Sequence, residues 1–200
     1  MPSYIRLMVK IAVDQLTVRA LSAETWDAFA ALAERHNGVW GGCWCTWFHT
    51  MHNEKTFDAD SNREVKHRLV VDGHAHAALV FDGELAVGWL EYGSPVELPN
   101  IYHRKEYEAG LERLPDYRLT CFFTDRNYRR QGVSAVALHG ALSLIATSGG
   151  GLVEAYPQDT AGKKITASFL YNGTRSLFEQ AGFTYQRPKG KNHCVMTKTV

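Results

Sequence analysis

Apolar residues in the first part of the chain recur at the spacing of two helices. The first run extends from Trp26 to Ala33 and is expected to end at the Asn-Gly pair of residues 37–38. Residues 61–64 read Ser-Asn-Arg-Glu, which is the spacing of a capping box, and apolar positions follow on one face up to residues 72–73. The pattern therefore predicts two amphipathic helices in this part of the chain.

Shorter apolar runs predict strands. Residues 75–81 and 85–92 are joined by Asp82-Gly83, a dipeptide that supplies the positive φ of a tight hairpin turn, so we expect antiparallel neighbours. Residues 94–114 break the pattern with prolines and charges, which predicts a loop with a short helix over residues 104–112. Loops of this kind often border binding sites. Further strands are expected at residues 15–19, 118–124, 152–156, 183–186 and 194–198, the last two as an antiparallel pair.

The strand at residues 118–124 leads into a basic turn that contains Gly132 and opens a helix predicted over residues 133–147. The first N–H groups of a helix have no intrahelical partner and lie at the positive end of its dipole, so they can bind a phosphate. Gly132 lets the backbone come close, and Arg129 and Arg130 add charged donors. Strand, turn and helix together predict a phosphate cradle.

The composition limits the class of protein and its partners. A chain of 200 residues with 45% hydrophobic and 22% charged content suits one globular domain. A net charge of +1 argues against nucleic-acid binding, which needs an extended basic surface. No apolar run approaches the about 20 residues of a membrane span, and residues 4–13 are too short and too charged for a signal peptide. We therefore expect a cytoplasmic protein whose few cysteines are reduced thiols.

Arg129, Gly132 and Ser134 have the spacing Arg/Gln, two residues, Gly, one residue, Gly/Ala, except that Ser134 stands where Gly or Ala is usual. In this spacing the chain resembles the acetyl-CoA signature of the GNAT superfamily of N-acetyltransferases. The order that follows is also similar: a helix, a glycine turn, a strand, and a run at residues 177–183 that looks like the family's closing helix and its Gly-Phe entry to the next strand.

The resemblance implies a single domain over residues 1–200, with a variable acceptor-side part at residues 1–80 and an acetyl-CoA-binding part at residues 82–200. Its α/β (α+β) fold would have a mixed, mostly antiparallel central sheet flanked by helices, in which a splayed strand pair holds the cofactor. The implied activity is transfer of an acetyl group from acetyl-CoA to a primary amine of a small molecule or peptide, by direct attack on the thioester. Homodimers are common in the family, so a homodimer stays open. The implied cofactor-binding residues are Phe122, Phe123, Thr124, Arg129, Arg130, Gln131, Gly132, Val133, Ser134 and Asn172.

Direct attack needs a base for the amine proton and is helped by an acid for the departing thiolate. Glu91 is the first candidate base, because it lies on the strand expected to pair with the central strand; the alternative is a solvent-facing carboxylate. Glu154, across the gap, is the second candidate. Phe178 stands where the resembled family often has an acidic Tyr, and Phe cannot donate a proton. Tyr171 is the third catalytic candidate: it stands where the family often has an Asn, with Asn172 beside it, and either could contact the cofactor, but neither inherits the acid role.

Phe178 also keeps a second hypothesis open, a non-catalytic CoA-binding sensor or interaction module that retains the cradle. Both hypotheses predict that CoA raises thermal stability, but only an enzyme releases CoA thiol when an amine is supplied. Lys163 and Lys164 are interpreted as a solvated surface pair, with contact to the adenosine phosphate of CoA as the alternative.

Residues 40–49 contain three Trp and two thiols separated by one residue. Together with His49 and His52 the thiols could suggest a metal, but they lack the usual zinc spacing, so a zinc module is the least favoured function and we expect no metal. One remaining interpretation is an apolar cluster under a loop, with Cys as a small buried hydrophobe. The other is an acceptor pocket whose aromatic faces hold a cationic or planar substrate. The predicted pocket residues are Cys43, Trp44, Cys45 and Trp47.

Overall fold

A seven-stranded mixed sheet forms the centre of the protein in a computed structural model that describes residues 12–160, 165–166 and 169–200. The strand order is β1-β2-β3-β4-β5-β7-β6, and every neighbouring pair is antiparallel except β4 with β5. Lys163, Lys164 and residues 4–11 of the segment considered as a signal peptide lie outside the described residues. The strands are β1 (Thr17–Ala20), β2 (His76–Asp82), β3 (Leu85–Gly93), β4 (Tyr117–Thr124), β5 (Leu152–Ala155), β6 (Thr184–Lys189) and β7 (His193–Thr199).

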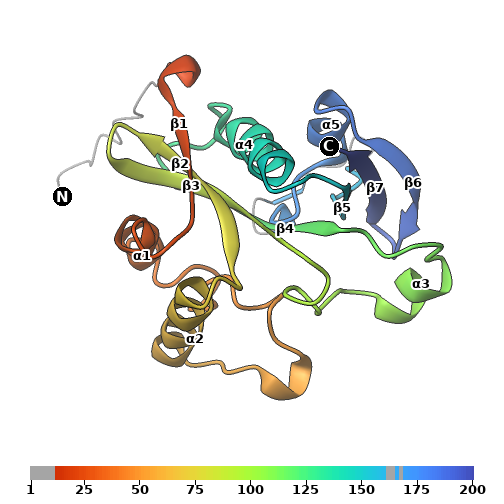
Figure 1. The fold of residues 1–200 in the computed structure, drawn as a ribbon, viewed down its shortest axis with the longest axis horizontal. Helices are drawn as coiled ribbons and strands as arrows, with labels where there is room; N and C mark the ends of the chain where they lie inside the picture. Colours follow the sequence, from red (N-terminus) through yellow and green to blue (C-terminus); the bar gives the residue numbers. More distant parts are fainter. Residues whose placement is uncertain (1–11, 161–164, 167–168) are drawn as a thin grey trace, which may run out of the picture.

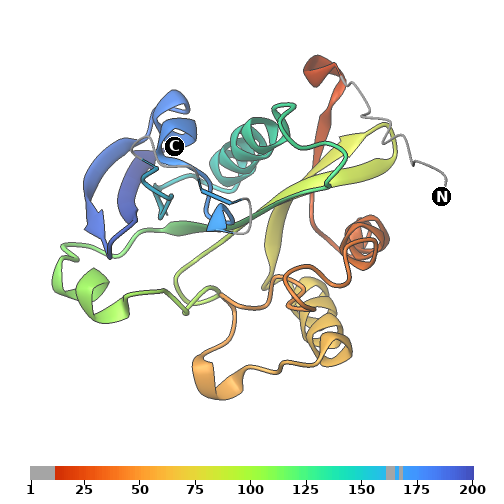
Figure 2. The same cartoon turned by 180° about the vertical axis from the view of Figure 1, so that it is seen from behind.

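Helices cover both faces of this sheet (Figures 1 and 2). One face, along β1 to β4, is covered by α4, whereas α1 packs against β3 on the opposite face, with α2 beside it. None of the helices in the described ranges is long and apolar enough to cross a membrane. The helices are α1 (Trp26–Glu34), α2 (Ala59–Val71), α3 (Arg104–Ala109), α4 (Val133–Thr147) and α5 (Arg175–Gln180), with short 3₁₀ turns η1 (Val13–Gln15) and η2 (His52–Glu54).

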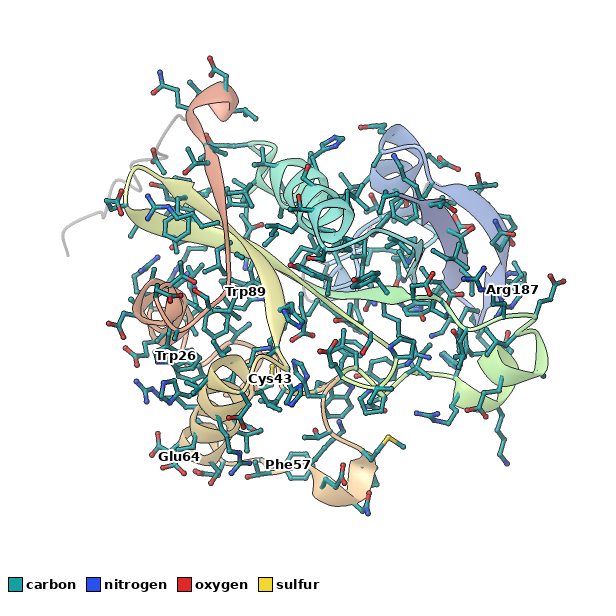
Figure 3. The ribbon with its side chains drawn as sticks, viewed as in Figure 1. Trp26, Cys43, Phe57, Glu64, Trp89 and Arg187 are labelled. Carbon is teal, nitrogen blue, oxygen red and sulfur yellow. The ribbon has the colours of Figure 1, made fainter. Side chains whose placement is uncertain are left out.

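Each face of the sheet carries its own apolar core. On the face of α4, Leu138 and Ile145 are fully buried, together with Phe178 of α5. On the other face, Phe29 of α1 packs against Trp89 of β3 with ring centroids 4.7 Å apart; Trp89 is labelled in Figure 3. The second core also takes in Trp44, Cys45 and Phe48 of residues 40–49, which we call the Cys-Trp segment, so that segment is packed onto the sheet.

The parallel strands β4 and β5 separate after a short paired stretch. They pair from Tyr117↔Val153 to Leu119↔Ala155, and β4 then continues to Thr124 without a partner in β5. In place of a neighbouring strand, the N–H of Phe122 donates a hydrogen bond of 2.6 Å to the carbonyl of Tyr171. The sheet therefore opens beside the second half of β4, just before the turn that leads to α4.

Several predictions from the pattern are confirmed. The hairpin forms with His76↔Tyr92 and Asp82↔Leu85 in register, and α4 spans Val133–Thr147 as its apolar spacing indicated. The closing antiparallel pair forms as β6 and β7. The predicted fold class, a mixed and mostly antiparallel sheet flanked by helices with one splayed pair, is also confirmed.

Other boundaries were wrong. Helix α2 begins at Ala59, and its N-cap is Asp58, whose carboxylate accepts from the Ser61 N–H at 2.8 Å; Ser61 lies inside the first turn and is not the cap. Because the chain forms a 3₁₀ turn at Val13–Gln15, β1 starts only at Thr17. Three more elements are shorter than predicted. Helix α1 stops at Glu34, before residues 37–38, and α3 stops at Ala109, before residue 112. Strand β6 begins at Thr184, one residue after the predicted start.

Candidate active site

The turn between β4 and α4 has a backbone geometry that is suited to binding a phosphate. Arg130 (φ 62°) and Gly132 (φ 82°) are both in the left-handed region, and Gly132 is the N-cap of α4. This region is open to glycine without strain but costs other residues energy. The turn is held from below, because Asp125 accepts from the Asn127 N–H at 2.9 Å and its own N–H donates to the Val87 carbonyl. The first N–H groups of α4 therefore start at a fixed position beside the open edge of the sheet.

A cavity of about 570 Å³ lies along this open edge. Three arginines line it, Arg126, Arg129 and Arg130, and no carboxylate of the described residues does. Asp125 is turned away, toward His36 at 3.2 Å. The cavity thus combines cationic side chains with the N-terminus of a 15-residue helix, an arrangement suited to a polyphosphate.

The residues predicted to bind the cofactor divide into those that line this cavity and those that support it. Gln131 holds the turn with its side-chain N–H on the Asn127 carbonyl (3.2 Å), and Val133 is buried in the core. Asn172 is also buried and lines a small adjoining cavity. Those that line the large cavity are Phe122, Phe123, Thr124, Arg129, Arg130 and Ser134.

A second cavity, of about 200 Å³, adjoins the first and shares Trp40 and Tyr171 with it. We call it the aromatic cavity. Of the predicted pocket residues, Trp44 does not line it: Trp44 is buried in the core and stacks on Trp26 with ring centroids 6.2 Å apart. The aromatic cavity is lined by Trp40, Cys43, Cys45, Trp47, Phe48, Tyr102, Cys121 and Tyr171.

The backbone around the aromatic cavity is unusual. Val39, Trp40, Trp44 and Cys45 all have positive φ, a conformation that costs non-glycine residues of order 1–3 kcal/mol each. Long-range bonds hold it in place, for example from the amide of Asn62 in α2 to the Gly42 carbonyl at 2.9 Å. This part of the chain is therefore shaped by its packing on α2 and not by local preference.

The thiols in the cavity wall are poor nucleophiles. Burial raises the pKa of Cys43 to about 12 and raises that of Cys45 well above its ordinary value. Both are therefore protonated near neutral pH, which argues against a covalent thiolate step. Across the described ranges, no group of three or more His, Cys, Asp or Glu is arranged to hold a metal ion.

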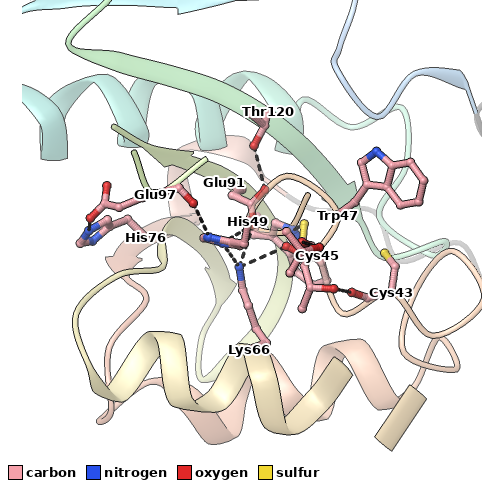
Figure 4. A network of polar contacts seen from close by, with 12 residues as sticks. Cys43, Cys45, Trp47, His49, Lys66, His76, Glu91, Glu97 and Thr120 are labelled. Atoms are coloured by element: carbon pink, nitrogen blue, oxygen red, sulfur yellow. Dashed lines mark hydrogen bonds and ion pairs between the residues drawn. The ribbon is translucent and has the colours of Figure 1, made fainter. Parts of the chain in front are cut away.

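Glu91 is not solvent-facing. It is fully buried on β3, where its Oε1 lies 2.7 Å from Lys66 Nζ of α2 and 3.2 Å from His49 Nε2, and Thr120 Oγ1 donates to its Oε2 at 2.7 Å (Figure 4). Burial alone would raise the pKa of Glu91, but the opposite charge of Lys66 outweighs it and holds that pKa below its usual range. Glu91 and Lys66 thus form a charged pair inside the protein.

His49 completes this network as a neutral ring. Its Nδ1 lies 2.9 Å from the carbonyl of Glu97, which can only accept, so Nδ1 carries the proton and Nε2 accepts from Lys66 at 3.0 Å. Burial lowers the pKa of His49, in agreement with a neutral imidazole. The network lies directly behind the aromatic cavity, since Lys66 Nζ is 3.4 Å from the carbonyl of Cys45.

The other two catalytic candidates have different surroundings. Glu154 is buried beside Arg118 and Tyr156, away from both cavities, and its Oε1 has no hydrogen-bond partner in the described part of the chain. Tyr171 lines both cavities as well as the small one that holds Asn172. Burial raises the pKa of Tyr171 above its ordinary value, so its hydroxyl stays protonated.

Sequence reasoning missed several residues of this site. Tyr102 lies in the loop that was expected to border a binding site, but nothing marked this residue within it. Cys121 reaches the aromatic cavity at a register shift between β3 and β4, opposite Glu91, and such irregularities are not visible in a hydrophobic pattern. Lys66 looked like one more polar residue of an amphipathic helix, although it is buried.

No family model and no curated protein matches the sequence. Solved structures do match the fold. A GNAT-family acetyltransferase from Streptococcus agalactiae superposes with a TM-score of 0.52 at 12% identity, covering 92% of this chain and 95% of its own. The PaiA N-acetyltransferase from Thermoplasma acidophilum, in complex with coenzyme A, superposes with a TM-score of 0.52 at 14% identity, covering 92% of this chain and 99% of its own. A ribosomal-protein-S5-alanine acetyltransferase from Vibrio fischeri superposes with a TM-score of 0.52 at 12% identity, covering 96% of both chains.

Proposed function

We propose, on the premise that this chain has the fold of the GNAT acetyltransferases, that it is an acetyl-CoA-dependent N-acetyltransferase acting on a primary amine of a small molecule or peptide. One observation carries the proposal: an arginine-lined cavity at the start of α4 and an aromatic cavity meet at Tyr171, beside the splay of β4 and β5. One cavity is suited to the cofactor and the other to an acceptor, and the groups to be joined would meet between them.

The chain's own residues fit coenzyme A. The N–H groups at the start of α4, with Arg129 and Arg130, would hold the pyrophosphate, and the edge of β4 would hold the pantetheine arm. The N–H of Phe122 is already bonded to the carbonyl of Tyr171, so the arm would use the edge nearer Thr124. Acetyl-CoA supplies the activated acetyl group as a thioester. The structural neighbour solved with coenzyme A supports this use of the fold.

Three residues predicted to be catalytic receive different roles in the proposal. Tyr171 is the proton donor to the departing thiolate, because its hydroxyl is protonated and the residue lines both cavities. Glu91 is a positioning residue that, with Lys66, fixes the wall of the aromatic cavity from behind. Glu154 receives no catalytic role, because it lines neither cavity.

The proposal is tested by thermal shift with acetyl-CoA, followed by an assay of CoA thiol release with a panel of amines. We expect acetyl-CoA to raise the melting temperature, and Arg129→Ala to reduce that rise. Arg113→Ala is the matched control, since Arg113 is an exposed arginine paired with Asp116 and does not line the cavity. No rise with the unmodified protein would reject the proposal.

One observation favours a second function, a non-catalytic CoA-binding module. Phe178, at the position where the resembled family often has an acidic Tyr, is fully buried and packs edge-on against Phe183 with ring centroids 5.0 Å apart. The usual acid position is therefore part of the core. A protein that is stabilised by CoA but releases no CoA thiol with any amine would have this second function.

A further inference from the structure

The wall of the aromatic cavity carries no exposed charge. Besides its aromatic rings it has three thiols, Cys43, Cys45 and Cys121, and the pKa of each is raised above its ordinary value, so all three are protonated. No carboxylate of the described residues lines it. A cationic group that entered would lose its hydration and find no anion in exchange, which is costly. The wall is therefore suited to an uncharged group.

Charges behind the wall do not change this conclusion. Lys66 and Glu91 are almost inaccessible, with side chains 1% exposed each, and they neutralise one another at 2.7 Å. Burial and the charge of Lys66 lower the pKa of His49, which favours its neutral form. The pair therefore presents no net charge to the cavity, and neither group can reach an occupant directly.

A cation already contacts one of the rings that line the cavity. The ammonium of Lys55 lies 3.9 Å from the centre of the Trp47 ring and donates to the carbonyls of Trp47 (2.6 Å) and Thr50 (2.8 Å). Burial lowers the pKa of Lys55 to about 8, so it is still mostly charged at neutral pH. Trp47 also stacks on Tyr102, with ring centroids 5.8 Å apart. The aromatic faces are therefore partly used, and Lys55 repels a second cation.

The size of the cavity limits its occupant further. At about 200 Å³ it is smaller than the roughly 300–1,000 Å³ of sites that take drug-sized ligands. Its opening toward the proposed thioester is at Trp40 and Tyr171, which it shares with the arginine-lined cavity. An occupant must therefore be small and must present its amine at that end.

We propose that the acceptor is a small apolar primary amine, with one aromatic ring or a branched alkyl group, that occupies the aromatic cavity uncharged. This inference rests on the proposed acetyltransferase function. The amine nitrogen forms a bond to the acetyl carbon, the carbon–sulfur bond breaks, and the proton lost by nitrogen is balanced by the one that the sulfur takes up through Tyr171. The products are an N-substituted acetamide and CoA thiol. Because an apolar site disfavours the ammonium form, the cavity itself keeps the nucleophile neutral.

The test compares 2-phenylethylamine with 1,4-diaminobutane, a diamine of similar length whose second amine stays charged when the reacting one is neutral, in the CoA-release assay. We expect kcat/KM to be higher for 2-phenylethylamine by about tenfold or more. Tyr102→Ala should raise KM for 2-phenylethylamine, whereas Tyr185→Ala should not; the two tyrosines are 40% and 39% exposed, and Tyr185 lies on β6 away from the cavity. Equal or better use of the diamine would overturn the inference.

A second variant tests the charge argument. Cys43→Asp places a carboxylate in the cavity wall and should shift the ratio of kcat/KM values toward the diamine by about tenfold. Val96→Asp adds the same charge at a surface position that is 88% exposed and should leave the ratio unchanged. Acetyl-CoA thermal shift shows that each variant is folded. An unchanged ratio in a folded Cys43→Asp protein would contradict the inference.

The two proposals fail in different ways. If acetyl-CoA does not stabilise the protein, the proposed function fails. If acetyl-CoA stabilises it and diamines or peptides are preferred, only the acceptor inference fails. If no amine is acetylated, 2-phenylethylamine is added to the CoA-bound protein: a further rise in melting temperature, absent with diaminobutane and reduced by Tyr102→Ala, supports the assignment of the cavity, and no rise overturns it.

Discussion

At the scale of single residues, the most unusual feature is a charged pair in the core. Lys66 and Glu91 are both almost completely buried, and their hydrogen bonds to each other, to His49 and to Thr120 satisfy most of their polar atoms. A buried pair of this kind adds little net stability, because desolvation offsets attraction, but removing one partner leaves the other charge stranded. Its value here is to join α2, β3 and β4 behind the aromatic cavity.

Lys66→Met should therefore destabilise the protein by about 3–5 kcal/mol, because Glu91 would remain buried without its cation. The matched control is Arg19→Met, which breaks the exposed Arg19–Glu84 pair and should have only a small effect. Chemical denaturation measures both. If the double variant Lys66→Met/Glu91→Leu is as unstable as Lys66→Met alone, the stranded charge is not the cause.

At the scale of elements, the turn between β4 and α4 owes its shape to glycine. Gly132 has a φ of 82°, and a Cβ placed there would come within 3.3 Å of Val13. A side chain in this position would be strained mainly by the backbone and would move the first N–H groups of α4, which are the groups proposed to hold phosphate.

Gly132→Ala should cost about 1–2 kcal/mol of stability and also weaken CoA binding. Gly73→Ala is the matched control: Gly73 has a φ of 73°, and an added Cβ would meet nothing within 4 Å. It should lose similar stability and keep its CoA affinity. Denaturation and a CoA binding titration separate the two effects, and equal affinities in the two variants would exclude a role for the turn.

At the scale of the whole molecule, the main feature is the place where the two cavities meet. The arginine-lined cavity is formed by β4 and the start of α4, and the aromatic cavity is formed by the Cys-Trp segment and the loop that carries Tyr102. They are joined through Tyr171, whose carbonyl accepts from the Phe122 N–H of β4. The main chain at Tyr171 thus replaces the missing strand partner and aims its side chain into both cavities.

Tyr171→Phe removes the hydroxyl and keeps both the ring and this main-chain hydrogen bond. If Tyr171 protonates the departing thiolate, kcat should fall by about 100-fold with little change in CoA affinity. Tyr185→Phe, on the exposed strand β6, should change neither quantity. Steady-state kinetics with a CoA titration measure both, and an unchanged kcat would remove Tyr171 from the mechanism.

The sequence by itself determined the parts of this protein that depend on neighbouring residues. The β2–β3 hairpin follows from alternating apolar positions around a glycine turn, and the bounds of α4 follow from helical spacing after Gly132. The glycine turn that opens α4 was predictable for the same reason, because the glycine and the start of the helix are adjacent along the chain. These features are set by local backbone geometry.

Only the tertiary structure decided which distant residues meet. From the sequence, Glu91 could be an exposed strand residue, but α2 places Lys66 against it. Trp44 could be a pocket residue, but it packs on Trp26 in the core. Tyr171 became the junction of two cavities because β5 leaves β4 early and the following loop takes its place. Such contacts link residues far apart in the chain, and no local spacing encodes them.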